Sequence, residues 1–279
     1  RVRCASRVDS LVVDDGRVTG VRLTDGSLLT AHVVVAACDP ARVFVDWLGD
    51  LPPVARRCAE RWRKMPVSEG FESKVDAVLT GRPTPAWGSS LADRHPDLDQ
   101  LGQSVCVSPS PDQVADAHIA KAKGRVAELP TLLLDFPSIA DPTMSPGEGR
   151  HVLSLEVLFT PYALVGGWEG SAEPERWLEL WAGMMEPGAL GLIESWRAMT
   201  PIRYENEFAM HRGHTPSCAV TPLAAFLGRP RETTRYRTPV KGLYLSGAGT
   251  FPGAGVVGAS GRNAADAVHR DIRGDSLFR

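Results

Sequence analysis

The residues best suited to chemistry in this chain are glycines near its end, which could hold the anionic or electron-rich part of a cofactor. Residues 243–261 read as a strand, a glycine-rich loop and the start of a helix. Glycine lets backbone N–H groups approach a ligand because it has no Cβ, and a helix N-terminus adds unpaired N–H donors. The residues alone favour two interpretations equally: a ligand loop, or a helix packed closely on a sheet through Gly258, Gly261 and Ala265.

Other catalytic patterns are weaker or absent from the sequence. Residues 253–258 match Gly-x-Gly-x-x-Gly, but a dinucleotide-binding unit also needs a following helix, a second strand and a distant acidic residue. Too few residues follow Gly258 for that, so we reject this interpretation. The Gly-x-Ser-x-Gly pattern of hydrolases and the phosphate-binding P-loop pattern do not occur.

A metal site is the next candidate, from His211, His214 and Cys218. Zinc needs three or four ligands on an ordered scaffold, and this segment contains Gly213 and Pro216 but no fourth ligand nearby. We therefore expect a polar loop near a substrate cavity and no metal.

Basic residues cluster twice. The first cluster lies on a predicted helix that also carries Glu60, and it consists of Arg56, Arg57, Arg61, Arg63 and Lys64. A solvated face is the favoured interpretation, with contact to a membrane surface or another subunit as the alternative. The second cluster precedes the glycine-rich segment and consists of Arg229, Arg231, Arg235 and Arg237. Here a solvated loop is favoured over a phosphate contact.

Three further residues have two interpretations each. Trp177 and Trp181 recur at helical spacing, which favours core packing over a substrate wall. Glu156 interrupts the apolar run 152–159. A strand with one solvated face explains it, and a carboxylate facing a cavity is the alternative.

Composition limits the class of protein. The 279 residues include 43% apolar and 23% charged residues, with a formal net charge of −2. This balance argues against nucleic acid as a partner, and no apolar run is long enough for a transmembrane helix. The five cysteines are scattered and the chain opens without a signal sequence, so we predict a reducing, cytoplasmic location.

The elements that must position these residues follow from hydrophobic pattern and turn chemistry. Asp-Gly turns separate three antiparallel strands at 8–13, 17–23 and 28–35. The apolar run 32–37 is typical of a parallel strand buried on both faces, and we expect it to pair with 243–246. Further strands are predicted at 70–79, 104–108, 131–136 and 151–160, and helices from Asp39-Pro40 onward and at 53–64, 112–123, 174–186 and 255–272. Residues 188–226 have no clear pattern.

The glycine-rich segment resembles the C-terminal FAD motif of phytoene-desaturase-like flavoproteins. The matching positions are Gly242-Leu243-Tyr244-Leu245, Gly247, Gly249-Thr250, Pro252-Gly253, Gly255-Val256, Gly258, Gly261 and Asn263-Ala264-Ala265. Residues 15–21 and 33–40 are similar to the meander and return strand of the same family. Residues 136–142, 149–154 and 160–168 resemble its members described as pyridine-nucleotide-disulfide-oxidoreductase-domain-containing. Two positions depart from the motif: Phe251 replaces a common His, and Ala254 replaces a common Gly.

The resemblance implies FAD as cofactor and a set of cofactor-binding residues. These are Ala36, Ala37, Gly247, Ala248, Gly249, Thr250, Gly255, Val256 and Val257. Phe251 stands where a polar or acid–base group would be expected, so no catalytic side chain is assigned. We expect this chain alone to bind FAD weakly or not at all, because the family's first strand and Gly-x-Gly-x-x-Gly have no counterpart in residues 1–37.

The predicted fold is α/β (α+β overall) in two domains. Residues 1–64 and 227–279 would form part of a Rossmann-like FAD-binding domain lacking its N-terminal βαβ. Residues 65–226 would form a substrate domain with a mixed or antiparallel sheet and helices.

The predicted function is the C-terminal portion of an FAD-dependent oxidoreductase, desaturase-like, acting on an apolar small molecule. The alternative is a non-catalytic interaction or regulatory module derived from a flavoprotein. Peripheral membrane contact and oligomerisation stay open, as do the substrate and the electron acceptor.

Overall fold

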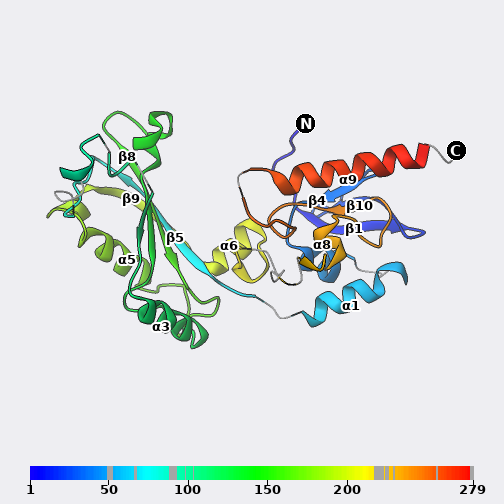
Figure 1. Cartoon of the computed structure of the whole chain (residues 1–279), viewed down its shortest axis with the longest axis horizontal. Coiled ribbons are helices and arrows are strands. Elements are labelled where there is room, and N and C mark those ends of the chain that lie inside the picture. Colours follow the sequence, from blue (N-terminus) through cyan, green and yellow to red (C-terminus); the bar gives the residue numbers. More distant parts are fainter. Residues whose placement is uncertain are drawn as a thin grey trace. The chain divides into compact units, whose positions relative to one another are not determined.

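The computed structural model divides the chain into two compact units (Figure 1). Unit 1 combines Arg1–Ser68 with Pro216–Arg279, and unit 2 is Glu69–Thr215. The structure describes residues 1–48, 53–65, 68–87, 93–97, 99–102, 104–216, 223, 226–228, 230–255 and 257–276. The fold is mixed α/β, as predicted. No helix among these residues has the length and apolar character needed to cross a bilayer.

Unit 1 begins with the predicted antiparallel meander. Its strands are β1 (Val8–Asp14), β2 (Arg17–Leu23) and β3 (Leu28–Thr30), in that spatial order. The turns between them use Gly16 and Gly26, both with φ in the left-handed region that glycine adopts readily.

A parallel strand pair follows, β4 (Val34–Ala36) with β10 (Leu243–Leu245). The predicted pairing is confirmed, but the predicted burial of β4 on both faces is wrong: Val35 is 46% exposed. Instead, all three residues of β10 are buried. An apolar run is buried on both faces only where other elements cover both faces, and among the described residues β4 pairs with β10 alone.

The first helical segment of unit 1 follows the predicted Asp39-Pro40 start. The Asp39 carboxylate accepts a hydrogen bond from the Ala41 N–H at 2.7 Å and caps the turn that leads into η1 (Arg42–Asp46). After η2 (Pro53–Ala55), α1 (Arg56–Lys64) buries Cys58, Ala59 and Trp62. Among its described residues, unit 1 also contains helices α8 (Arg231–Thr234) and α9 (Ala259–Ser276).

Unit 2 is built on a five-stranded antiparallel sheet of order β6-β7-β8-β5-β9. Its strands are β5 (Glu72–Leu79), β6 (Val105–Val107), β7 (Leu132–Asp135), β8 (His151–Leu158) and β9 (Ile193–Met199). Its helical segments are α3 (Pro111–Ala122), α4 (Pro137–Ala140), η3 (Pro142–Met144), α5 (Glu173–Ala182), η4 (Ala189–Leu192), α6 (Pro201–Phe208) and η5 (His211–Gly213).

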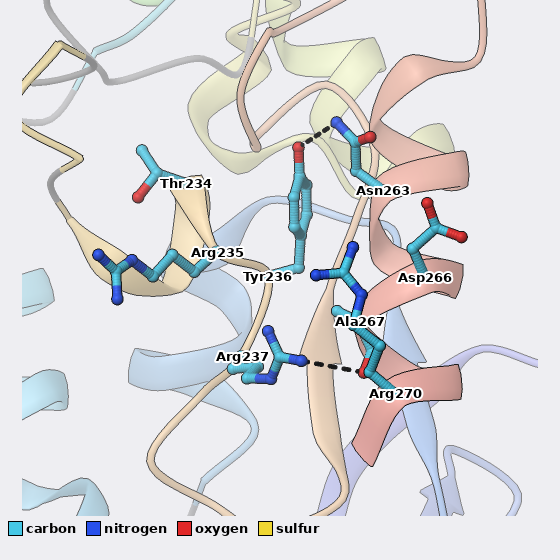
Figure 2. Close-up of a pocket in the computed structure, with 8 residues that line it drawn as sticks. All are labelled: Thr234, Arg235, Tyr236, Arg237, Asn263, Asp266, Ala267 and Arg270. Carbon is cyan, nitrogen blue, oxygen red and sulfur yellow. Dashed lines mark hydrogen bonds between the residues drawn. The ribbon is translucent and has the colours of Figure 1, made fainter. Parts of the chain in front are cut away.

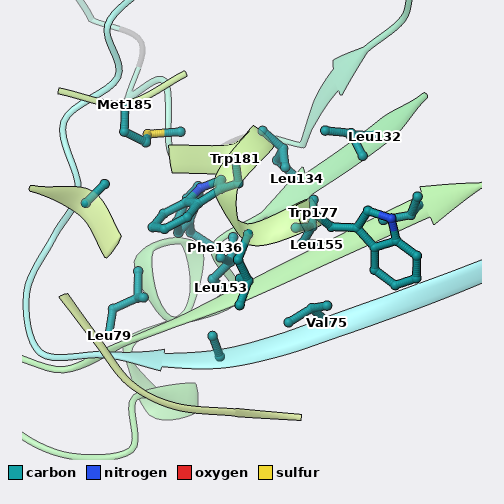
Figure 3. Close-up of a cluster of buried hydrophobic side chains, with 14 of the residues drawn as sticks. Val75, Leu79, Leu132, Leu134, Phe136, Leu153, Leu155, Trp177, Trp181 and Met185 are labelled. Carbon is teal, nitrogen blue, oxygen red and sulfur yellow. The ribbon is translucent and has the colours of Figure 1, made fainter. Parts of the chain in front are cut away.

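Alternate residues of β5 and β8 point to one apolar face (Figure 3). Trp177 and Trp181 of α5 pack against that face and are fully buried. The core interpretation of the two tryptophans is confirmed.

Candidate functional site

The carboxyl ends of β4 and β10 lie at the same edge of the parallel pair. Three of the predicted cofactor-binding residues come together there: Ala36, Ala37 and Gly247. The Ser246 N–H donates to the Ala36 carbonyl at 2.9 Å. Gly247 has φ +79°, and a Cβ placed on it would lie 3.2 Å from the Ala37 carbonyl oxygen. The backbone therefore turns away from β10 at a point where glycine fits and a larger residue is strained.

The loop after Gly247 closes on itself. The N–H and hydroxyl of Thr250 both donate to the Gly247 carbonyl, at 3.1 and 2.8 Å, and the Gly253 N–H donates to the Thr250 carbonyl at 2.7 Å. Thr250 is fully buried, and Gly249 is buried while Ala248 is half-buried. The Thr250 side chain therefore holds the loop in shape, and any direct contact of this turn with a cofactor falls to its backbone.

The glycines that could have packed α9 on the sheet do not do so. Gly258 and Gly261 are exposed, and a Cβ on either would meet nothing within 4 Å. Ala265 is exposed too. The packing interpretation of these three residues is wrong; the buried face of α9 carries Ser260, Ala264 and Ala267.

Gly255 and Val257 flank the start of α9 on the exposed side. A Cβ on Gly255 would meet only the Val257 side chain, at 3.9 Å, and Val257 is 81% exposed. Val256 lies outside the described residues. The Arg262 N–H donates to the Gly258 carbonyl at 3.0 Å, so the helical bonds start there and the first N–H groups of α9 have no acceptor within the helix. An exposed glycine-rich loop before a helix N-terminus can bind an anionic or electron-rich group.

A pocket of about 320 Å³ lies between α9 and residues 234–237 (Figure 2). Arg237 lines it, but its guanidinium makes two hydrogen bonds to Asp271, at 2.7 and 2.8 Å. Asp266 and Arg270 line it as well. The charges in this pocket are mixed, which does not favour a phosphate site. The predicted solvated loop is wrong in part, because Arg231 begins helix α8 and Arg237 pairs with Asp271, although Arg231, Arg235 and Arg237 are exposed. Arg229 lies outside the described residues.

In unit 2, Glu156 lies on the sheet face opposite the apolar core. In the β5–β8 register it stands opposite Lys74, and Lys74 forms an ion pair with Asp76 at 2.9 Å. Burial raises the pKa of the Glu156 carboxyl, and Lys74 opposes this rise. This face is therefore polar and partly shielded from water.

The histidine segment shows no metal-binding arrangement in the part that is described. Burial lowers the pKa of His214, and Lys121 lowers it further. Cys218 lies outside the described residues, and among those inside them no group of three or more His, Cys, Asp or Glu side chains is placed to hold a metal ion.

Comparison with known proteins agrees with the motif in residues 242–265. The chain is 30% identical to mouse pyridine nucleotide-disulfide oxidoreductase domain-containing protein 2, over 94% of this chain and 45% of the relative. It is 29% identical to a neurosporene-forming phytoene desaturase of Rhodobacter capsulatus, over 91% of this chain and 46% of the relative. The predicted resemblance is confirmed.

The relatives also show how much of a longer protein this sequence matches. The chain spans about half the length of the curated relatives it matches. Among solved structures it is similar to cyclohexylamine oxidase from Brevibacterium oxydans, with a TM-score of 0.51, 16% identity, and coverage of 95% of this chain and 48% of that one. This likeness supports the fold. No protein-family model matches the chain.

Sequence reasoning overlooked Tyr236, whose hydroxyl bonds to the glycine-rich loop. It belongs to none of the matching motif positions and to no periodic pattern. The one available signal was its place shortly before the β10 strand.

Proposed function

We propose that this chain is part of an FAD-dependent oxidoreductase of the phytoene-desaturase-like group, with the flavin at the glycine-rich loop. One observation carries the proposal. Gly247, at the carboxyl edge of the parallel β4–β10 pair, opens a loop that leads to Gly255, Gly258 and Gly261. These three glycines of the FAD motif are exposed, and they do not serve helix packing. Ligands of α/β sheets bind outside the carboxyl ends of parallel strands.

The residues present fit one side of a flavin site. The flavin site would use backbone N–H groups of residues 247–249, Gly255 and Val257, together with the start of α9. These groups would bind the electron-rich edge of the ring system and favour negative charge there. The flavin supplies the redox chemistry when bound. Phe251, at 47% exposure, offers an apolar side chain beside the loop and no proton carrier. We therefore assign no acid–base role to this position.

Unit 2 is proposed as the substrate side. A small-molecule substrate and its apolar character are both implied by the resemblance. The charged sheet face around Lys74 and Glu156 does not favour an apolar ligand on that surface. An apolar substrate would have to contact other residues.

Flavin content tests the proposal. A longer natural protein that contains this chain should purify yellow and release FAD on denaturation, while the chain alone should bind FAD weakly or not at all in a titration. A longer protein that is colourless and shows no FAD binding would overturn the flavin assignment and favour the non-catalytic module.

Two valine substitutions localise the contact. Neither Gly255 nor Gly261 has a left-handed φ, and both have room for a Cβ, so neither variant should lose much stability. Gly255→Val should reduce flavin retention, because its side chain would occupy the exposed side of the loop. Equal flavin loss in Gly261→Val, at unchanged thermal midpoints, would contradict a specific role for Gly255.

A further inference from the structure

The main chain of Phe251 is held from both sides by the segment that precedes β10. Its N–H donates to the Thr233 carbonyl at 2.9 Å, and its carbonyl accepts from the Tyr236 hydroxyl at 2.6 Å. The Ser260 hydroxyl approaches the same carbonyl at 3.4 Å. Phe251 lies in the middle of the glycine-rich segment, so these contacts fix the loop where it leaves the Gly247–Thr250 turn.

Tyr236 connects the strand before this loop with the middle of the loop. Its carbonyl accepts from the N–H of Leu245, the last residue of β10, at 2.8 Å, while its hydroxyl reaches Phe251. The Asn263 side-chain amide donates to the Tyr236 hydroxyl at 2.8 Å (Figure 2). Because that bond occupies an acceptor position of the hydroxyl, the Tyr236 proton is directed at the Phe251 carbonyl.

The backbone of Tyr236 is unusual for a residue of its size. It has φ +64°, and its side chain is 6% exposed. A bulky residue in the left-handed region is strained, and such strain persists where the surrounding structure over-determines it, often near functional sites. The conformation allows one residue to contact β10 with its carbonyl and the loop with its ring hydroxyl.

Helix α8 anchors this arrangement to α1. Glu232 is 4% exposed, and its carboxylate accepts from the Trp62 indole N–H at 2.7 Å and from the Arg61 guanidinium. Thr233, the next residue, is fully buried. The Thr233 carbonyl, which accepts from the Phe251 N–H, is therefore held in place by the contacts between α8 and α1.

We propose that Tyr236 is a positioning residue that sets the conformation of the glycine-rich loop, and through the loop the flavin site. The flavin part rests on the proposed function. Tyr236 itself acts through Phe251 and is assigned no contact with the cofactor.

The test compares Tyr236→Phe with Tyr244→Phe. Both tyrosines are 6% exposed, and the Tyr244 hydroxyl donates to Asp271 at 2.9 Å, away from the loop. Amide hydrogen exchange of Phe251 and Gly253, measured in this chain, should accelerate about threefold to tenfold in Tyr236→Phe. That range corresponds to the loss of one hydrogen bond. Tyr244→Phe should leave these amides unchanged.

A second readout uses the longer protein. Tyr236→Phe should weaken FAD binding by a similar factor and alter the visible circular dichroism of bound FAD, while Tyr244→Phe should do neither. A purely structural role would instead lower the thermal midpoint and accelerate exchange throughout unit 1.

Equal exchange at Phe251 in wild type and Tyr236→Phe, or uniform acceleration across unit 1, would overturn the proposal. Faster loop exchange with unchanged FAD affinity would overturn the link to the flavin. Wild-type protein that never binds FAD, with faster exchange confined to the loop in Tyr236→Phe, would contradict the proposed function and support the loop-holding role.

Discussion

Gly247 allows the sharpest test of the parallel strand edge, through Gly247→Ala. The substitution has two costs. An L-residue in the left-handed region costs about 1–2 kcal/mol, and here φ is +79°. The new Cβ would also lie 3.2 Å from the Ala37 carbonyl oxygen and 3.3 Å from its carbonyl carbon. Relieving a tight contact with backbone typically costs about 1–3 kcal/mol.

The expected loss of stability for Gly247→Ala is therefore about 2–5 kcal/mol. Gly26→Ala is the matched control, because Gly26 has φ +82° in the same unit and nothing within 4 Å of its Cβ position. The stability of Gly26→Ala should fall by only about 1–2 kcal/mol, which is the cost of placing alanine in the left-handed region.

The assay is thermal and urea unfolding of both variants, in which each kcal/mol lowers the midpoint by about 2–4 °C in a chain of this size. If Gly247→Ala were no less stable than Gly26→Ala, the close approach of Gly247 to Ala37 could not be a rigid feature of the site edge.

Three more outcomes are expected. Trp177→Ala should destabilise unit 2 by about 3–5 kcal/mol in urea unfolding, because the side chain is fully buried in the core; a loss below about 1 kcal/mol would contradict the core assignment. Glu156→Gln should raise the thermal midpoint at pH 7.5, with the gain disappearing toward pH 4. A carboxyl whose pKa is raised by folding favours the folded state when protonated and loses that contribution as the pH rises; a lower midpoint at pH 7.5 would count against this. Burial raises the pKa of Cys58 to about 12, so at pH 8 only about one in ten thousand of its thiols is ionised. Iodoacetamide should label the exposed Cys4 far faster than Cys58, and equal rates would refute the burial.

Local signals predicted much of the fold. Asp-Gly turns marked the meander. The helix predicted at 112–123 is α3, and the structure shows that Ser110 and Gln113 form a capping box at its start. The paired strands 32–37 and 243–246 were found from apolar runs alone. The turns and the helix start depend on neighbouring residues in the sequence, which is why they could be predicted. The β4–β10 pairing joins segments far apart in the sequence, and it followed from the need of each apolar strand for a partner.

The errors came from tertiary context. Two faces of α9 carry small residues at helical spacing, and no local signal distinguishes the buried face from the exposed one. The structure buries Ala264 and Ala267 and leaves Gly261 exposed. The helix was predicted from residue 255, but Gly258 has φ +67° and α9 begins at Ala259. Strand β9 was missed because its burial does not alternate along its length.

The discontinuity of unit 1 has a consequence for biosynthesis. Unit 2 is contiguous, so it can fold as soon as residue 215 has left the ribosome, whereas β4 must wait for β10. Domains generally fold as units during synthesis. Unit 2 lies in the sequence between β4 and β10, so once it is folded, a shorter flexible loop has to be closed when these two strands pair. Nascent chains arrested before residue 243 should therefore present a protease-resistant unit 2 beside a protease-sensitive β4. Until residues 243–245 have left the ribosome, Val34 would lack its strand partner and be open to chaperones.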